Sequence, residues 1–67
     1  MPQVIANGTS MPAPVPCSIT ALLQHLGQMP RSVVVEINGE AVSPSEFDAR
    51  TVQEGDRLEI VRIVAGG

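Results

Sequence analysis

The sequence has 67 residues, of which 43% are hydrophobic and 16% charged; this length predicts a single domain, and this composition is typical of a folded protein. A chain this small has little room for a deep cleft walled by its own layers, so we do not expect an enzyme. Seven acidic residues against four arginines give a net charge of −3, which argues against nucleic acid as a partner.

The first elements form a hairpin and a connector. An apolar-rich run at Gln3–Ala6 and a returning strand at 9–11 flank Asn7-Gly8. This dipeptide favours a type I′ turn because both of its residues tolerate positive φ. The segment 12–16 contains three prolines and cannot be a central strand, because each proline lacks a backbone donor. We therefore expect an extended connector there.

A short helix follows. Ser18 is a typical N-cap, and Gly27 is a typical residue after a helix C-terminus. The apolar stripe between them consists of Ile19, Leu22, Leu23 and Leu26, at helical spacing. A helix this short is marginal alone, so the stripe must pack on a sheet.

A second hairpin follows the helix. The β-branched run at 32–37 predicts a strand, Asn38-Gly39 a second type I′ turn, and Glu40–Val42 the returning strand. Ser43-Pro44-Ser45-Glu46 has the pattern of a capping box, with Ser43 as the cap and Glu46 reaching back. It predicts one helical turn that carries Phe47.

The last strand is predicted at 57–64, after a tight turn at 54–56. As the longest and most apolar strand, it should lie near the centre of the sheet. A right-handed crossover through the helix can place the strand at 32–37 parallel to a strand of the first hairpin. The fold class is therefore α+β, a β-grasp (ubiquitin-like) domain over 1–67 with one main helix on one face of a mixed sheet. Residues 65–67 should form a flexible C-terminal tail.

Few side chains are candidates for chemistry. His25 is the one histidine and should be an exposed helix residue, so no metal site is expected. Cys17 precedes the N-cap; it is either a reactive thiol of low pKa or, as we prefer, a small apolar residue that packs towards Leu22. The serines have no arranged base, so no catalytic residue is predicted. One cysteine, no signal-peptide pattern and no apolar run of about 20 residues favour a cytoplasmic protein outside the membrane.

The C-terminal sequence Val64-Ala65-Gly66-Gly67 carries the functional prediction. An ionised main-chain carboxylate is a poor acyl donor, but an enzyme that uses ATP can convert it to an acyl-adenylate. The catalytic pocket must then enclose the reacting carbonyl, and glycine has no Cβ to collide with the channel walls. We expect Gly67 to be the modified residue and Ala65 and Gly66 to thread into the partner.

The last strand also predicts a docking face. Leu58 and Ile60 alternate with Val61 and Ile63. If the first two pack under the helix, then Val61 and Ile63 point outward. Val34 on the neighbouring strand joins them in a candidate partner-docking face, although the two faces could be reversed.

The chain resembles the ThiS family, the small sulfur carriers of thiamin biosynthesis. The resemblance covers Asn7-Gly8, the helix at 18–23, the block at 35–40 and, most specifically, Glu54-Gly55-Asp56-Arg57-Leu58-Glu59-Ile60-Val61 with the final Gly66-Gly67. Members often have Val-Pro-Arg where this chain has Val42-Ser43-Pro44. The proline-rich connector and Pro2 are also unusual.

The resemblance implies a β-grasp co-substrate rather than an enzyme, with no bound cofactor. A ubiquitin-activating-type adenylyltransferase (ThiF-like) would adenylate the Gly67 carboxylate with ATP, and sulfur from a persulfide relay would convert it to a thiocarboxylate. Thiazole synthase (ThiG-like) would then receive the sulfur. The alternatives are a carrier for molybdopterin synthesis or another thiocarboxylate pathway, a ubiquitin-like protein modifier, and a binding module with an incidental Gly-Gly end.

Overall fold

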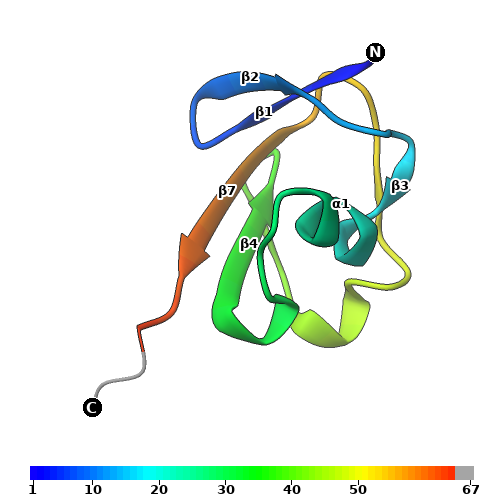
Figure 1. Cartoon of the computed structure of the whole chain (residues 1–67). Helices are drawn as coiled ribbons and strands as arrows, with labels where there is room; N and C mark the ends of the chain where they lie inside the picture. The colour runs from blue at the N-terminus through cyan, green and yellow to red at the C-terminus, as the bar shows by residue number, and fades with distance from the viewer. Residues whose placement is uncertain (65–67) are drawn as a thin grey trace.

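The structure is a computed structural model that describes residues 1–64 (Figure 1). Its strands and helices are β1 (Gln3–Ala6), β2 (Thr9–Pro12), β3 (Cys17–Ser18), α1 (Ile19–His25), the 3₁₀ turn η1 (Pro30–Ser32), β4 (Val33–Ile37), β5 (Glu40–Val42), the 3₁₀ turn η2 (Pro44–Glu46), β6 (Thr51–Val52) and β7 (Arg57–Arg62). The predicted tail at 65–67 lies outside the described residues, so its flexibility stays a prediction.

The main sheet has five strands in the order β2-β1-β7-β4-β5. The strand β7 is central, as predicted, and runs parallel to β1 and antiparallel to β4. The parallel pair is therefore formed by the first and last strands. We expected the crossover through the helix to pair β4 in parallel with a strand of the first hairpin. This pairing is absent, because β7 lies between β4 and the first hairpin. The mixed sheet with one helix against it confirms the predicted β-grasp arrangement.

Both predicted type I′ turns are present. Asn7 and Asn38 each have φ of 51°, and the glycines after them have φ of 80° and 83°. These paired positive φ values match the right-handed twist of the flanking strands. The two turns fix the register of β1 with β2 and of β4 with β5.

The helix α1 begins and ends as its sequence predicts. The Ser18 side chain accepts a hydrogen bond from the Ala21 N–H at 3.0 Å. At the other end Gly27 has φ of 74°, and the N–H of Gln28 donates to the Leu23 carbonyl at 2.8 Å. These bonds satisfy backbone groups that a helix leaves unpaired at its ends.

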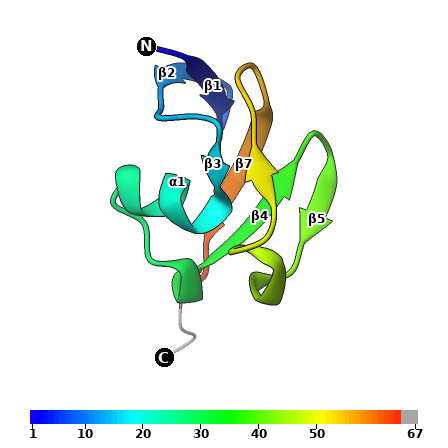
Figure 2. The same cartoon turned by 90° about the vertical axis from the view of Figure 1, so that its right-hand side faces the viewer.

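The core lies between α1 and the main sheet (Figure 2). The predicted stripe supplies Ile19, Leu22 and Leu23, while Leu26 is partly buried at the rim. From the sheet, β4 buries alternate valines and β7 buries Leu58 and Ile60. The remaining buried hydrophobic residues of the cluster are Val4, Ala13, Val15, Ile37, Val42, Phe47 and Val52.

Three local expectations need correction. Cys17 and Ser18 form a strand that pairs with Val52 and Thr51, a second small sheet that we did not predict. The capping box does not form: the Glu46 N–H, which the Ser43 side chain should cap, donates to the Ser43 carbonyl at 2.9 Å in the tight 3₁₀ turn. The last strand stops at Arg62 rather than at residue 64. Within residues 1–64, no helix is long and apolar enough to cross a membrane.

Candidate tail-presenting strand and docking face

The strand β7 is paired with β4 over most of its length and with β1 at its beginning. On one side it is in register with β4 from Ile37↔Leu58 to Val33↔Arg62. On the other side it pairs with β1 at Ile5↔Arg57 and Ala6↔Leu58. A final bond joins the Ile63 N–H to the Ser32 carbonyl at 2.7 Å. The chain is therefore anchored to within one residue of Val64, the last described residue.

Two turn asparagines extend this anchoring with their side chains. The Asn7 carboxamide accepts from the Ile60 N–H at 2.7 Å and donates to the Ile60 carbonyl at 3.0 Å. In the turn between β4 and β5, the Asn38 carboxamide accepts from the Arg57 N–H at 3.0 Å and donates to the Asp56 carboxylate at 3.1 Å. Sequence reasoning assigned these asparagines only to their turns. Their backbone-like bonds to β7 depend on tertiary placement.

The side chains of β7 divide between two faces as predicted. Leu58 and Ile60 are 0% and 9% exposed, whereas Val61 and Ile63 are 59% and 52% exposed. Val34 is 49% exposed and lies directly opposite Val61 in the register of the two strands. We call Val34, Val61 and Ile63 the apolar strip. Its exposure is confirmed, and its role in docking stays a prediction.

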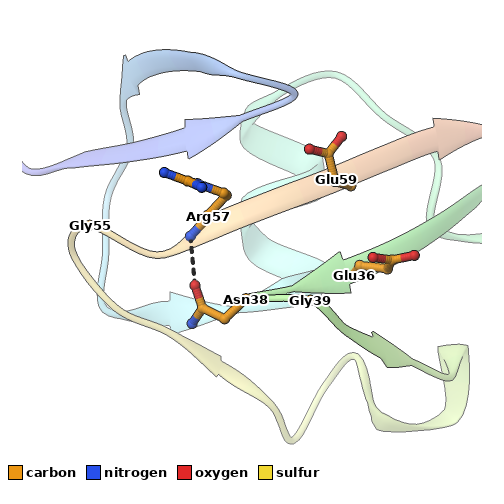
Figure 3. Close-up of a pocket in the computed structure, with 6 residues that line it drawn as sticks. All are labelled: Glu36, Asn38, Gly39, Gly55, Arg57 and Glu59. Atoms are coloured by element: carbon orange, nitrogen blue, oxygen red, sulfur yellow. Dashed lines mark hydrogen bonds between the residues drawn. The ribbon is translucent and has the colours of Figure 1, made fainter.

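A polar region adjoins the apolar strip on the same open face. Glu36 and Glu59 are exposed and lie directly opposite each other on β4 and β7, two residues along each strand from Val34 and Val61. They line an open hollow of about 530 Å³ together with Asn38 and Arg57 (Figure 3). Sequence reasoning did not single out either glutamate. Strand alternation predicted the outward face for Glu59 alone, and only the register between the strands brings Glu36 beside it.

The other candidate side chains occupy structural positions. The exposed His25 ring has Nε2 3.3 Å from the Pro12 carbonyl oxygen. Cys17 is partly buried against the core, and burial raises the pKa of its thiol above the usual range. This direction is opposite to that of a reactive, low-pKa cysteine. Among residues 1–64, no three His, Cys, Asp or Glu side chains gather as a metal site.

The three residues predicted to carry the chemistry, Ala65, Gly66 and Gly67, lie outside the described part of the chain. Val64 precedes them and is 81% exposed. What the structure describes is the strand from which the tail leaves and the face beside it.

Comparison with known proteins identifies the family. The model of the ThiS family matches residues 4–67. The chain belongs to the ThiS family. This confirms the family that the sequence motifs predicted, and the match includes the final Gly66-Gly67.

Individual relatives of this ThiS-family chain fall into two groups. It is 26% identical over 65 residues to the sulfur carrier protein ThiS of Escherichia coli K12, covering 97% of this chain and 98% of the relative. It is 37% and 36% identical to segments of the thiazole synthases of Paramagnetospirillum magneticum and Magnetococcus marinus. The alignments cover 97% of this chain and 20% of each synthase, so the chain spans about a fifth of their length.

Solved structures show the same fold. The crystal structure of the thiamine biosynthesis protein ThiS from Geobacter metallireducens superposes with a TM-score of 0.82 at 32% identity, covering 97% of this chain and 99% of that one. The solution structure of a thiamine biosynthesis protein from the same organism gives a TM-score of 0.78 at 32% identity and covers 97% and 87% of the two chains. The ThiS-family chain thus has the β-grasp fold over the matched length.

Proposed function

We propose that this ThiS-family chain is a sulfur carrier of thiamin biosynthesis, a protein co-substrate whose tail is processed by partner enzymes. In the first step, the Gly67 carboxylate attacks the α-phosphate of ATP on a ubiquitin-activating-type adenylyltransferase (ThiF-like), and pyrophosphate leaves. The terminal sulfur of a persulfide then attacks the acyl carbon and AMP leaves, which gives an acyl disulfide; a thiol cleaves its S–S bond, forms a disulfide with the sulfur that leaves, and releases the thiocarboxylate. The thiocarboxylate donates its sulfur on a thiazole synthase (ThiG-like), and an oxygen atom from water or from the sulfur acceptor replaces it, which regenerates the carboxylate.

The observation that carries this proposal is the anchoring of β7. A tail of three small residues reaches a buried catalytic pocket only if the folded domain holds its base against the enzyme surface. Strand β7 is bonded on its β4 side up to Ile63, one residue before Val64, and on its β1 side by backbone pairing at Arg57 and Leu58 and by the Asn7 side chain at Ile60. Ordering each tail residue costs roughly 1–2 kcal/mol in backbone entropy. Contacts of the exposed apolar strip with the enzyme would offset this cost.

The chain itself supplies binding rather than catalysis. The thiol of Cys17 is partly buried with a raised pKa, and His25 lies on the helix surface away from the apolar strip. Chemistry at the Gly67 carbonyl therefore depends on groups of the partner, including its bound ATP. We place the reaction in the cytoplasm, where a free thiol and a thiocarboxylate both remain reduced.

The test is an accurate intact mass after incubation with ATP, the adenylyltransferase and a sulfur source. Exchange of oxygen for sulfur gives nearly the same nominal mass change as oxidation of Met1, Met11 or Met29. Fragmentation must therefore place the change on Gly67. We expect a sulfur-containing Gly67 only when ATP is present.

The control is a variant that lacks Gly67, since it keeps every described residue. It should acquire no sulfur, and a C-terminal tag on the full chain should have the same effect. If the full chain acquires no sulfur from an adenylyltransferase that is active on another carrier, the carrier function is wrong. A protein modifier or a binding module then becomes the better hypothesis.

A further inference from the structure

The open face of the main sheet has an arrangement of charge that the fold does not require. Glu36 and Glu59 are directly opposite each other on adjacent antiparallel strands. Like charges in this arrangement destabilise a sheet. Within residues 1–64 the one ion pair joins Arg50 to Glu40, at 2.8 Å. Neither the Glu36 nor the Glu59 carboxylate therefore has a cation at contact distance in this part of the chain.

A basic side chain nearby does not remove this excess of negative charge. Arg57 lies two residues before Glu59 on the same face and lines the same hollow. Its backbone N–H is held by Asn38, and its side chain forms no ion pair within the described part of the chain (Figure 3). Arg57 therefore pairs with neither carboxylate, and with two acidic side chains and one basic side chain the lining of the hollow keeps a net negative charge.

The acidic pair is continuous with the apolar strip. Along β7 the outward side chains are Arg57, Glu59 and Val61, and the exposed Ile63 follows directly after the strand. Along β4 the outward side chains are Glu36 and Val34, which lie opposite Glu59 and Val61. A surface that covers Val34 and Val61 must therefore also approach the two carboxylates. A cation there would offset their repulsion and their desolvation.

A second copy of this chain does not satisfy these requirements. Each copy carries one acidic pair, Glu36 and Glu59. Face-to-face association of two copies would bring both pairs into one apolar interface, where their negative charges repel each other. The complementary surface is apolar with an adjacent basic side chain, and arginine suits it best because its planar fork bonds carboxylates in two places. Such a surface belongs to a different protein.

We propose that a thiazole synthase docks on this open face, with an apolar patch against Val34 and Val61 and an arginine or lysine side chain between Glu36 and Glu59. The inference rests on the proposed function, in which this enzyme receives the tail. Among the two partner enzymes, thiazole synthase is favoured because this chain matches segments of proteins that bear that name. The acidic pair thereby acts as a specificity determinant, retained at the expense of sheet stability.

The experiment titrates the full chain into the thiazole synthase of the source organism and measures Kd at several salt concentrations. The variants are Glu36→Gln and Glu59→Gln, which remove charge while keeping shape. The matched control is Glu46→Gln, an exposed glutamate on η2, which is followed by Phe47, whose carbonyl accepts from the Thr20 N–H of α1 at 3.2 Å. We expect each variant of the pair to weaken binding about three- to tenfold at low salt, and the control to stay within about twofold.

Two further readouts separate recognition from structure. The loss should shrink at high salt, because the Debye length falls from about 10 Å at 0.1 M to about 3 Å at 1 M. The same variants should unfold at a higher urea concentration than the wild type, since they relieve the cross-strand repulsion. If the two glutamates had only a structural role, a substitution that stabilises the protein would not weaken its binding to the synthase. Weaker binding together with higher stability therefore indicates that the glutamates take part in recognition.

The inference is overturned if both variants bind like the Glu46→Gln control, if the wild type does not bind the synthase, or if the chain instead self-associates through this face. The mass test on Gly67 distinguishes these outcomes from failure of the proposed function. If Gly67 acquires sulfur while the variants bind normally, the carrier function stands and only the docking inference fails. If Gly67 acquires none, the carrier function fails whatever the affinities.

Discussion

The side chain of Asn7 bonds to the backbone of Ile60 through both of its polar atoms, at 2.7 and 3.0 Å, across 53 positions of sequence. β1 ends at Ala6, so the carboxamide continues the parallel ladder where the backbone of the first hairpin turns away. Ile60 faces the core and its neighbour Val61 belongs to the apolar strip. The bond therefore connects the first turn of the chain to the strand that presents the tail.

Replacing Asn7 with glycine should destabilise the protein by roughly 1–3 kcal/mol, because two partly buried hydrogen bonds contribute about 0.5–1.5 kcal/mol each. Glycine keeps the positive φ of the turn, and the backbone entropy that it adds to the unfolded chain is the same in the Asn38→Gly control. Urea unfolding measures the difference. Asn38→Gly is the matched control, since Asn38 has the same φ and its bonds are exposed to water. Equal losses in the two variants would show that the buried position of the Asn7 bonds is unimportant.

Much of this fold was predictable because local chemistry and tertiary structure agree. The Asn-Gly pairs at 7–8 and 38–39 specify turns that only positive φ satisfies, and the structure has those φ values. The stripe from Ile19 to Leu23 is buried where helical spacing placed it. Strand alternation also placed Val61 and Ile63 on the open face, since one registered strand cannot bury both of its faces under a single helix.

The remaining features depend on contacts between distant segments. The pairing of Cys17 with Val52 joins two-residue strands, which are too short to have a periodicity of their own. The opposition of Glu36 and Glu59 depends on the register of β4 with β7, which no local pattern determines. The capping box predicted at Ser43 is absent for a related reason. Its sequence pattern is compatible with both a 3₁₀ turn and an α-helical turn, so local sequence does not determine which of the two forms.

Ser18, which caps α1 with its side chain, and Ser43, which caps nothing with its side chain, provide a direct test of that distinction. Ser18→Ala should cost about 1 kcal/mol of stability, because it leaves the Ala21 N–H without its acceptor. Ser43→Ala should cost less than about 0.5 kcal/mol, because the Ser43 hydroxyl bonds only to the exposed side chains of Ser45 and Glu46. Urea midpoints of the two variants give the comparison. A larger loss at Ser43 would contradict the bonding described here.

The thiol of Cys17 should react slowly with alkylating reagents at neutral pH. Burial raises its pKa, so the reactive thiolate is scarcer in the folded protein than in the unfolded chain. The alkylation rate, followed by mass against pH, should rise only above the range of an ordinary thiol, and the urea-unfolded chain serves as the control. A folded chain that reacts as fast as the unfolded one at neutral pH would contradict this prediction.

The raised pKa of Cys17 also predicts a dependence of stability on pH. The folded state holds the thiol proton more tightly than the unfolded state does. The contribution of the protonated thiol to stability is therefore complete below the pKa that Cys17 has in the unfolded chain. It is lost as the pH rises through the folded pKa. Cys17→Ala should remove this alkaline decline in the unfolding midpoint. An unchanged pH profile in the variant would assign the decline to other groups.

The apolar strip should be required for sulfur transfer and dispensable for folding. Val34→Thr with Val61→Thr keeps both side chains β-branched and nearly unchanged in volume, and both residues are about half exposed. We expect the free energy of unfolding to change by less than about 0.5 kcal/mol per site. With thiazole synthase, the KM for the thiocarboxylated variant should rise about tenfold at nearly constant kcat, as expected when binding shared by ground and transition states is lost. Met29→Gln is the control, because Met29 is 65% exposed in the loop after α1 and outside the strip. A normal KM in the strip variant, or an equal rise in the Met29 control, would remove the strip from the docking surface and leave the tail alone to account for recognition.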